Sequence, residues 1–470
     1  MINLRHIFFL FILIPIGTFS QLKVGVLTEK QVLWYVRNYH PIAIQGSLLL
    51  DQGESTVRSA RGDFDPYLKG DLNQKYFDDK EYFSILNGGL VVPTWYGIEL
   101  KTGYDQNRGA FLDPENNVPD NGLWYAGISV PLGQGLIIDK RRATLRQAQI
   151  FAESTLVERQ SLMNDLFFNA INQYWKWVEA WNQIQVFEEA VELAQTRFAG
   201  VKRSFEFGDV PAIDTLESLI QFQNRQISLG QARINYQKES FDLSNYLWFE
   251  ENTPLEISDE LQAPAYKSIE LIEVGNAFDF QNRLERLPLT HPEMQLVDYK
   301  LSSLEIDRKL KAEGLKPKVN LNYNALNEPV SGDAFDQYSS QNYKWGVGFS
   351  FPLFLREQRG NLELTKLKIQ DTELSRQQKL LELQNKLRSY YNEQLILDGQ
   401  INLFSTTVDN YERLFEGEVQ KFDSGESSLF LINSREMNLI QARLKLVELI
   451  AKYNIAIKGL GWASGNLYQN

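Results

Sequence analysis

The two halves of this sequence carry the same landmarks in the same order, and this internal repeat limits the possible folds more than any other feature. The matching pairs are His40-Pro41 with His291-Pro292, Pro66 with Pro317, Val130-Pro131-Leu132 with Phe351-Pro352-Leu353, and Phe205 and Gly208 with Phe422 and Gly425. Matches in a constant order indicate that one structural unit has been duplicated. The first copy is the longer one, because Pro131 comes 65 positions after Pro66, whereas Pro352 comes only 35 positions after Pro317.

Each copy contains a long segment without proline in which apolar residues recur every seven positions. In the first copy this segment covers residues 138–205, which are 68 residues with one glycine, Gly200. Heptad spacing predicts helices that pack side by side, and 68 residues of helix are roughly 100 Å long. The second copy runs from about residue 361 to residue 422. Each long helix is predicted to end at a glycine turn and to be followed by a return helix, at 212–248 and 429–459.

Segments of alternating apolar and polar or small residues lie between the helices of each copy. In the second copy Val319, Leu321 and Tyr323 alternate with three asparagines. This period predicts strands with one apolar and one polar face, as in the wall of a water-filled membrane barrel. An ordinary antiparallel sheet with one solvated face gives the same pattern. The position of both strand pairs between helices favours the barrel.

The additional residues of the first copy predict one more strand hairpin, at residues 82–106, which turns near Pro93 and Trp95. Both flanking helices are expected on the same side of the membrane, so the number of strand crossings has to be even. We therefore expect this hairpin at the outer mouth of the barrel, where it would either extend the wall or cover the opening.

The N-terminus has the pattern of a secretory signal peptide, with Arg5 and His6 before an apolar run at 7–16 and small residues before Gln21. Ten apolar residues are too few for a transmembrane helix, which needs roughly 20. The expected organisation is a signal peptide at 1–20, a first repeat at 21–253 (strands at about 66–131, helical hairpin at about 138–248), an equatorial linking segment at 254–289, and a second repeat at 290–470 (strands at about 317–353, helical hairpin at about 360–460).

The chemistry of enzymes and of nucleic-acid binding is not apparent in this sequence. The net charge is -12 and cysteine is missing, so neither a basic surface for nucleic acid nor a lipid anchor on cysteine is expected. His40 and His291 occupy equivalent helix starts and are predicted to cap helices rather than to bind metal. Trp175 and Trp177 are predicted to pack between helices. We expect no enzymatic activity, no cofactor and no metal.

The paired layout resembles the TolC-like outer membrane efflux protein family (outer membrane factors) over about residues 27–460. The resemblance implies an α+β membrane protein with two internal repeats per chain. It implies a homotrimer in which each chain gives four strands to a shared 12-stranded β-barrel, continued by a long coiled-coil α-helical periplasmic tube. The implied location is the cell outer membrane, with an extension into the periplasm. The implied partners are a periplasmic adaptor (membrane fusion) protein, an inner-membrane transporter and the lipid of the outer membrane.

The predicted function is that of an outer-membrane channel subunit in a tripartite efflux or type I secretion system. Such a channel is a passive exit duct for substrates that an inner-membrane pump and a periplasmic adaptor deliver. The alternative is a soluble periplasmic coiled-coil scaffold or adaptor protein, which would be extracted without detergent and would not form a heat-modifiable oligomer.

Acidic residues near the hairpin turns are the candidates for a channel aperture. Family members often carry an acid six residues after the hairpin glycine, and Asp214 has this position in the first copy, with Glu217 three residues further on. The equivalent positions of the second copy are not acidic, so Asp423 and Glu426 are the other candidates. In a homotrimer each acid would be present three times around one axis and would attract cations.

Each of these acids could equally be a solvated residue at a helix end, where carboxylates interact favourably with the helix dipole. The turns themselves are the predicted contacts with the adaptor. The residues concerned are Gly208, Asp209, Gly425 and Ser427.

Overall fold

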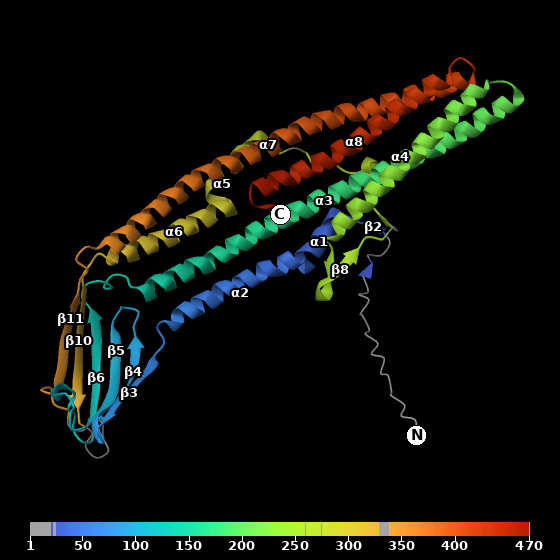
Figure 1. Ribbon diagram of the computed structural model, residues 1–470. Coiled ribbons are helices and arrows are strands. Elements are labelled where there is room, and N and C mark those ends of the chain that lie inside the picture. The colour runs from blue at the N-terminus through green and yellow to red at the C-terminus, as the bar shows by residue number, and fades with distance from the viewer. Residues whose placement is uncertain (1–19, 22–24, 259, 274, 329–337, 470) are drawn as a thin grey trace, which may run out of the picture. The chain divides into compact units, whose positions relative to one another are not determined.

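The computed structural model describes residues 20–21, 25–258, 260–273, 275–328 and 338–469 (Figure 1). The predicted signal peptide at 1–20 therefore lies outside the described residues, except for Ser20. The chain divides into two compact units. The first comprises residues 1–45, 162–285 and 384–470, and the second comprises residues 46–161 and 286–383. Each unit contains residues of both repeats.

The helices repeat with nearly the same lengths in both halves. The first half has α1 (Glu29–Tyr39), α2 (Pro41–Gly62), α3 (Lys140–Phe207) and α4 (Ala212–Ser244), and the second has α5 (Ala277–Thr290), α6 (Pro292–Glu313), α7 (Arg356–Asp423) and α8 (Leu429–Ala463). Helices α3 and α7 are both 68 residues long, and α2 and α6 are both 22 residues long. The predicted duplication is therefore confirmed. Within the described residues, no helix combines the length and apolar character needed to cross a membrane.

Side-chain caps fix several helix starts. Thr28 and Gln31 form a capping box at α1, in which each side chain bonds the backbone of the other residue. His40 Nδ1 accepts a hydrogen bond from Ile42 N (3.1 Å) at the start of α2, and His291 Nδ1 accepts one from Glu293 N (3.2 Å) at the start of α6. The prediction that these histidines cap helices is confirmed.

The second unit contains one six-stranded antiparallel sheet in the order β11-β10-β6-β5-β4-β3 (Figure 1). Its strands are β3 (Tyr67–Phe77), β4 (Lys80–Pro93), β5 (Glu99–Arg108), β6 (Leu123–Pro131), β10 (Lys318–Asn327) and β11 (Tyr343–Ser350). The two repeats meet where β6 pairs with β10. Short strands complete the chain: β1 (Ser20–Gln21), β2 (Gly25–Val26), β7 (Trp248–Phe249), β8 (Thr253–Glu256) and β9 (Leu261–Gln262).

The hairpin of β4 and β5 corrects two expectations. It lies between β3 and β6 within the sheet, so each chain provides six strands and not four. Its turn lies at the end of the sheet where the helices attach, because Trp95 stacks on Phe64 next to the end of α2, with ring centroids 4.3 Å apart. The requirement for an even number of crossings is met, since the first repeat crosses the sheet four times. The expectation that the hairpin turns at the outer mouth was wrong.

The cross-strand register gives the sheet one apolar and one polar face. The apolar face carries Leu68 and Leu72 of β3, Leu86, Leu90 and Val92 of β4, Leu100 and Tyr104 of β5, Trp124, Ile128 and Val130 of β6, Val319, Leu321 and Tyr323 of β10, and Trp345, Val347 and Phe349 of β11. The polar face carries Lys69, Asp71 and Asn73 of β3, Asn87 of β4, Glu99, Lys101 and Asp105 of β5, Ser129 of β6, Asn320, Asn322 and Asn324 of β10, and Lys344 of β11. Apolar exceptions on the polar face are Phe83, Ile85, Val91 and Leu123, and polar exceptions on the apolar face are Gln74, Gln106 and Arg108.

The helices that precede and follow the strands of the second unit pack in pairs. Ala60 and Phe64 pack against Leu145 and Ala148, which joins α2 to the start of α3. On the other repeat, Arg376 of α7 donates a hydrogen bond to Asp298 of α6 at 2.6 Å. The same helix arrangement therefore flanks the strands of both copies.

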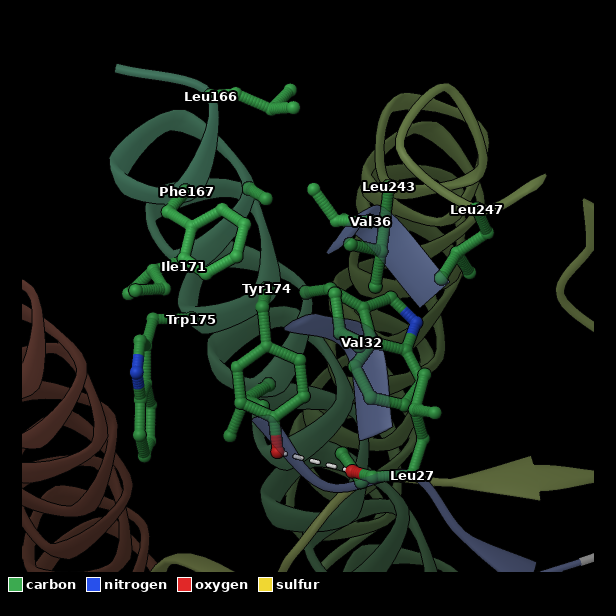
Figure 2. Close-up of a cluster of buried hydrophobic side chains, with 14 of the residues drawn as sticks. Leu27, Val32, Val36, Leu166, Phe167, Ile171, Tyr174, Trp175, Leu243 and Leu247 are labelled. Atoms are coloured by element: carbon green, nitrogen blue, oxygen red, sulfur yellow. Dashed lines mark hydrogen bonds between the residues drawn. The ribbon is translucent and has the colours of Figure 1, made fainter. Parts of the chain in front are cut away.

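The core of the first unit forms where α1, α3 and α4 meet (Figure 2). Tyr174 is buried, and its hydroxyl donates a hydrogen bond to Leu27 O at 3.0 Å. Trp175 Nε1 donates to Glu29 Oε2 (2.9 Å), and Trp177 Nε1 donates to Ser240 Oγ (3.1 Å). Both tryptophans are buried, so the prediction that they pack between helices is confirmed.

The segment between the repeats packs on the helices of the first unit. Asn182 of α3 donates to Pro264 O at 3.0 Å and accepts from Tyr266 N at 2.8 Å. Tyr453 of α8 donates to Ile272 O at 2.6 Å. These bonds attach the segment to one helix of each repeat.

Candidate functional site at the helix-hairpin tips

The turns that join α3 to α4 and α7 to α8 have the same backbone geometry. Gly208 and Gly425 have φ angles of +80° and +75°, a conformation that L side chains rarely adopt. The residue after each glycine donates back into the helix, from Asp209 N to Ser204 O (2.9 Å) and from Glu426 N to Lys421 O (2.8 Å). These six-to-one bonds define Schellman motifs, which satisfy the last carbonyl groups of a helix. The glycine turns predicted in both copies are confirmed.

The return helices begin differently in the two copies. Pro211 precedes α4 and provides no side-chain cap, whereas the Ser428 hydroxyl accepts a hydrogen bond from Leu431 N at the start of α8 (3.4 Å). Ser427 donates its hydroxyl proton to Glu418 Oε1 at 2.5 Å. Ser427, a predicted adaptor contact, is therefore held by α7 of its own chain, and the tip of the second copy has more side-chain bonds than the tip of the first.

The four predicted aperture acids have different surroundings. Asp423 and Glu426 are exposed at the turn between α7 and α8. Asp214 is half-buried in the first turn of α4. Glu217 accepts a hydrogen bond from Asn433 Nδ2 of α8 at 3.2 Å. The structure therefore connects Glu217 to a neighbouring helix of its own chain and leaves Asp423 and Glu426 in contact with solvent.

A buried polar cluster behind the tips was missed in the sequence. Arg197 of α3 forms an ion pair with Glu436 of α8 and also donates to Asn433 Oδ1 at 3.1 Å. Arg225 of α4 lies in the same region, with Nη1 3.7 Å from Met437 Sδ. Burial lowers the pKa of Arg225, and the charge of Glu436 opposes this shift. Helices α3, α4 and α8 are thus joined by charged groups that are largely removed from water.

A second buried arginine joins three helices further along α8. Arg443 bonds Glu189 of α3 at 2.8 Å and also bonds Glu412 of α7. Burial opposes the charge on Arg443, but the two carboxylates hold the pKa of Arg443 above its ordinary value. A signal for these residues existed, because Asn433, Glu436 and Arg443 interrupt the apolar positions of α8 at spacings of three and seven residues. Polar residues at such positions often fix the register of packed helices.

The described residues contain no group of three or more His, Asp or Glu side chains placed to hold a metal ion. The tips offer turns, exposed carboxylates and buried ion pairs.

Comparisons with known proteins identify relatives of this architecture. Residues 285–466 match the outer membrane efflux protein family. No curated protein matches the chain by sequence. The fold is similar to that of the CmeC outer membrane channel of Campylobacter jejuni, with a TM-score of 0.64 and 15% identity, covering 96% of this chain and 90% of that chain.

Two further channels have the same fold. The outer membrane protein VceC of Vibrio cholerae has a TM-score of 0.65 and 12% identity, covering 93% of this chain and 96% of that chain. The MtrE outer membrane channel of Neisseria gonorrhoeae has a TM-score of 0.64 and 12% identity, covering 93% of this chain and 89% of that chain. The fold is thus shared over nearly the full length of both partners in each comparison.

The predicted fold class is confirmed in its architecture of paired long helices and an antiparallel sheet, apart from the strand count. The family that residues 285–466 match consists of outer membrane efflux proteins, which agrees with the predicted outer-membrane location and channel function. The family match covers the second repeat, and the shared fold extends over nearly the whole chain, so the duplicated architecture is similar to that of outer membrane efflux proteins.

Proposed function

We propose that this chain is a subunit of the outer-membrane channel of a tripartite efflux or type I secretion system. In this role it is a passive exit duct for substrates that an inner-membrane transporter and a periplasmic adaptor deliver. The observation that carries the proposal is the amphipathic sheet, in a chain whose second repeat matches the outer membrane efflux protein family. A sheet with one apolar face and one polar face suits a wall between lipid and a water-filled lumen.

The apolar face is too exposed for a soluble monomer. Leu68 is 84% exposed, Phe349 is 70% exposed and Trp345 is 62% exposed. Contiguous apolar patches of this kind mark surfaces that bind protein or membrane. The alternative of a soluble periplasmic scaffold or adaptor leaves these side chains in water, so the membrane role is favoured.

The sheet edges support a homotrimer. Among the described strands, β3 and β11 each pair on one side only, and both are exposed along their whole length. Unpaired strand edges bind further strands, and closure into a barrel removes them. Outer-membrane lipid then covers the apolar face, and neighbouring copies cover the edges.

The hairpin tips are the proposed site of adaptor contact and of the aperture. Gly208, Asp209, Gly425 and Ser427 form the adaptor surface in this proposal. Asp423 and Glu426 are the better aperture candidates, because they are exposed whereas Glu217 bonds Asn433. Asp214 remains a candidate beside them.

The function is tested by extraction and by conductance. The full chain, expressed in a Gram-negative host, is expected to fractionate with the outer membrane, to need detergent for extraction, to have the mass of a trimer and to conduct ions in planar bilayers. A monomer extracted without detergent and without conductance would contradict the proposal and support the scaffold.

The aperture is tested separately by reversal potentials in a salt gradient. The double variant Asp423→Asn with Glu426→Gln is expected to lower the preference for cations, and Asp214→Asn with Glu217→Gln is expected to lower it less. Unchanged selectivity in the first variant would remove Asp423 and Glu426 from the aperture.

A further inference from the structure

We propose that the β4–β5 hairpin is part of the membrane wall, so that three copies of this chain close an 18-stranded barrel instead of a 12-stranded one. This inference rests on the proposed channel function and deepens it. Three copies of a six-stranded sheet give 18 strands. Barrel diameter grows roughly linearly with strand number, so the lumen would be about 1.5 times as wide, and barrels of about 16–18 strands leave an aqueous channel.

Hydrogen bonding supports the hairpin as wall. Strand β4 pairs with β3 from Tyr67↔Val91 to Phe77↔Lys80, with one irregularity after Lys75. Strand β5 pairs with β6 from Glu99↔Ser129 to Asp105↔Leu123. A hairpin that covered the opening would leave β3 and β6 free to pair with each other. In this structure, β4 and β5 fill the space between them.

The side-chain alternation of the hairpin continues the faces of its neighbours. Leu90 of β4 lies beside Leu68 of β3 and Thr102 of β5, on the apolar face. Asn87 lies beside Asp71 and Asp105, on the polar face. A shift of one residue in either strand would exchange the two faces. The register therefore fits lipid on one side and water on the other in all six strands, except near the β3–β4 turn, where Gln74, Gln106 and Arg108 lie on the apolar face.

A close contact on the polar face holds the hairpin in place. The Tyr125 side chain of β6 lies over Gly103 of β5 and reaches Gly89 of β4. A Cβ atom added at Gly103 would be 2.5 Å from the Tyr125 hydroxyl, and one at Gly89 would be 2.8 Å from it. Aromatic side chains that cover glycines in this way help to pin strand register. This contact joins strands β4 and β5 to β6, the strand through which the first repeat pairs with β10 of the second repeat.

The turn of the hairpin is anchored at the helix end of the sheet. Trp95 stacks on Phe64, and Thr94 N donates to Ile98 O at 2.9 Å. Arg141 at the start of α3 forms an ion pair with Glu99 at the start of β5. Strands β4 and β5 have 14 and 10 residues, and a membrane-spanning strand needs about 9–11. Both strands are therefore long enough to cross and are fixed at the same end as their neighbours.

The two edge strands of a six-stranded sheet can pair between neighbouring copies and so close a barrel. All neighbouring strands are antiparallel, and with six strands the two edge strands β3 and β11 run in opposite directions. Rotation around a threefold axis brings β3 of one copy beside β11 of the next with antiparallel polarity, and the strand total is even, as in bacterial barrels. Each edge strand of one copy therefore pairs with the opposite edge strand of a neighbouring copy.

Introduced cysteine pairs test the wall directly, because the chain has no cysteine of its own. Thr102 and Ala126 are direct partners in β5 and β6. Facing residues of antiparallel strands lie within the distance that a disulfide bridges. We expect Thr102→Cys with Ala126→Cys to form an intrachain disulfide in the outer membrane. The matched control, Thr102→Cys with Ala325→Cys, joins positions two strands apart and is expected to stay reduced.

The closure is tested on the polar face of the edge strands. Asp71→Cys is combined in turn with Lys344→Cys, Gly346→Cys and Gly348→Cys, since the register between copies has to be found. At least one combination is expected to give a covalent trimer on a non-reducing denaturing gel, and each single variant is expected to give none.

The width is measured by polymer exclusion in planar bilayers. Deletion of residues 79–108 removes β4 and β5 and leaves β3 connected to β6 through the loop at 109–122. Polyethylene glycols added from the loop side are expected to enter the native channel up to a radius about 1.5 times the limit for the deletion variant. Equal limits would overturn the wider barrel.

The outcomes separate this inference from the proposed function. A covalent trimer and conductance without the Thr102–Ala126 disulfide would leave the channel intact and overturn the six-stranded wall. Loss of trimer and of conductance in the native chain would overturn both. If the deletion variant fails to fold, the two sets of cysteine pairs alone decide whether the wall has six strands per chain.

Discussion

The ion pair between Arg197 and Glu436 should contribute more to the packing of the tips than any exposed pair on the same helix. The Glu436 side chain is 4% exposed and that of Arg197 is 13% exposed. Removal of one partner from a buried pair costs about 3–5 kcal/mol, because the other charge stays buried without compensation. Arg197 would keep its bond to Asn433 at 3.1 Å, so we expect the lower end, about 3 kcal/mol, for Glu436→Leu.

Hydrogen exchange of the α8 amides in the detergent-solubilised protein measures this cost. A loss of about 3 kcal/mol in the free energy of local opening corresponds to exchange on the order of a hundredfold faster around residue 436. The matched control is Glu448→Leu on the same helix, where Glu448 pairs with Lys445 and Lys452 at the surface. Exposed pairs contribute about 0–1 kcal/mol, so exchange should change less than about fivefold.

The double variant Arg197→Met with Glu436→Leu completes the cycle. Replacement of both charges by apolar groups removes the cost of leaving Arg197 unpaired, whereas Arg225 still loses the charge of Glu436, so we expect part of the protection to return. If Glu436→Leu exchanges like Glu448→Leu, or if the double variant exchanges faster than the single one, the account of this cluster is refuted.

Further predictions concern the wall, a turn and a half-buried acid. Gly103→Ala should reduce the yield of heat-stable oligomer on gels, because its Cβ would be 2.5 Å from the Tyr125 hydroxyl. The control Gly88→Ala should be tolerated, because its Cβ would meet no atom within 4 Å. Equal yields of oligomer from the two variants would contradict this prediction. Gly208→Ala should destabilise the end of α3 by about 1–2 kcal/mol in hydrogen exchange, since the φ angle of Gly208 is +80°. The control Gly200→Ala, inside the helix, should stabilise α3 by about 0.5–1 kcal/mol. A loss of stability in both variants would argue against the turn geometry. Burial, and then the charge of Glu448, raises the pKa of Glu179. The folded state therefore binds this proton more readily than the unfolded state, and stability should fall as pH rises from about 4.3 through the raised pKa. Glu179→Gln should remove that pH dependence in thermal melts and Glu188→Gln should keep it; the same slope in both variants would exclude Glu179 as its source.

The elements that the sequence predicted are those with strong periodic signals. Heptad spacing and the repeated glycine turns identified α3 and α7, because packing and turn geometry both depend on local residue types. Alternation in β10 and β11 identified the apolar face for the same reason. The two copies supported each other, so a weak signal in one was strengthened by the other.

The placement of the β4–β5 hairpin could not be predicted from the sequence. Both an outer-mouth hairpin and two more wall strands satisfy the even number of crossings, and the choice depends on the stacking of Trp95 on Phe64, which are 31 positions apart. The buried cluster around Glu436 was missed because its partners come from three helices. Ion pairs between distant segments leave no local pattern beyond a polar residue at an apolar position.

A role of this chain in the wall of an outer-membrane channel is tested by native mass and conductance measured on one detergent-extracted sample. We predict a species of three chains that inserts into planar bilayers and opens steps of uniform conductance. A monomeric species that inserts into no bilayer, from a preparation extracted without detergent, would contradict the account.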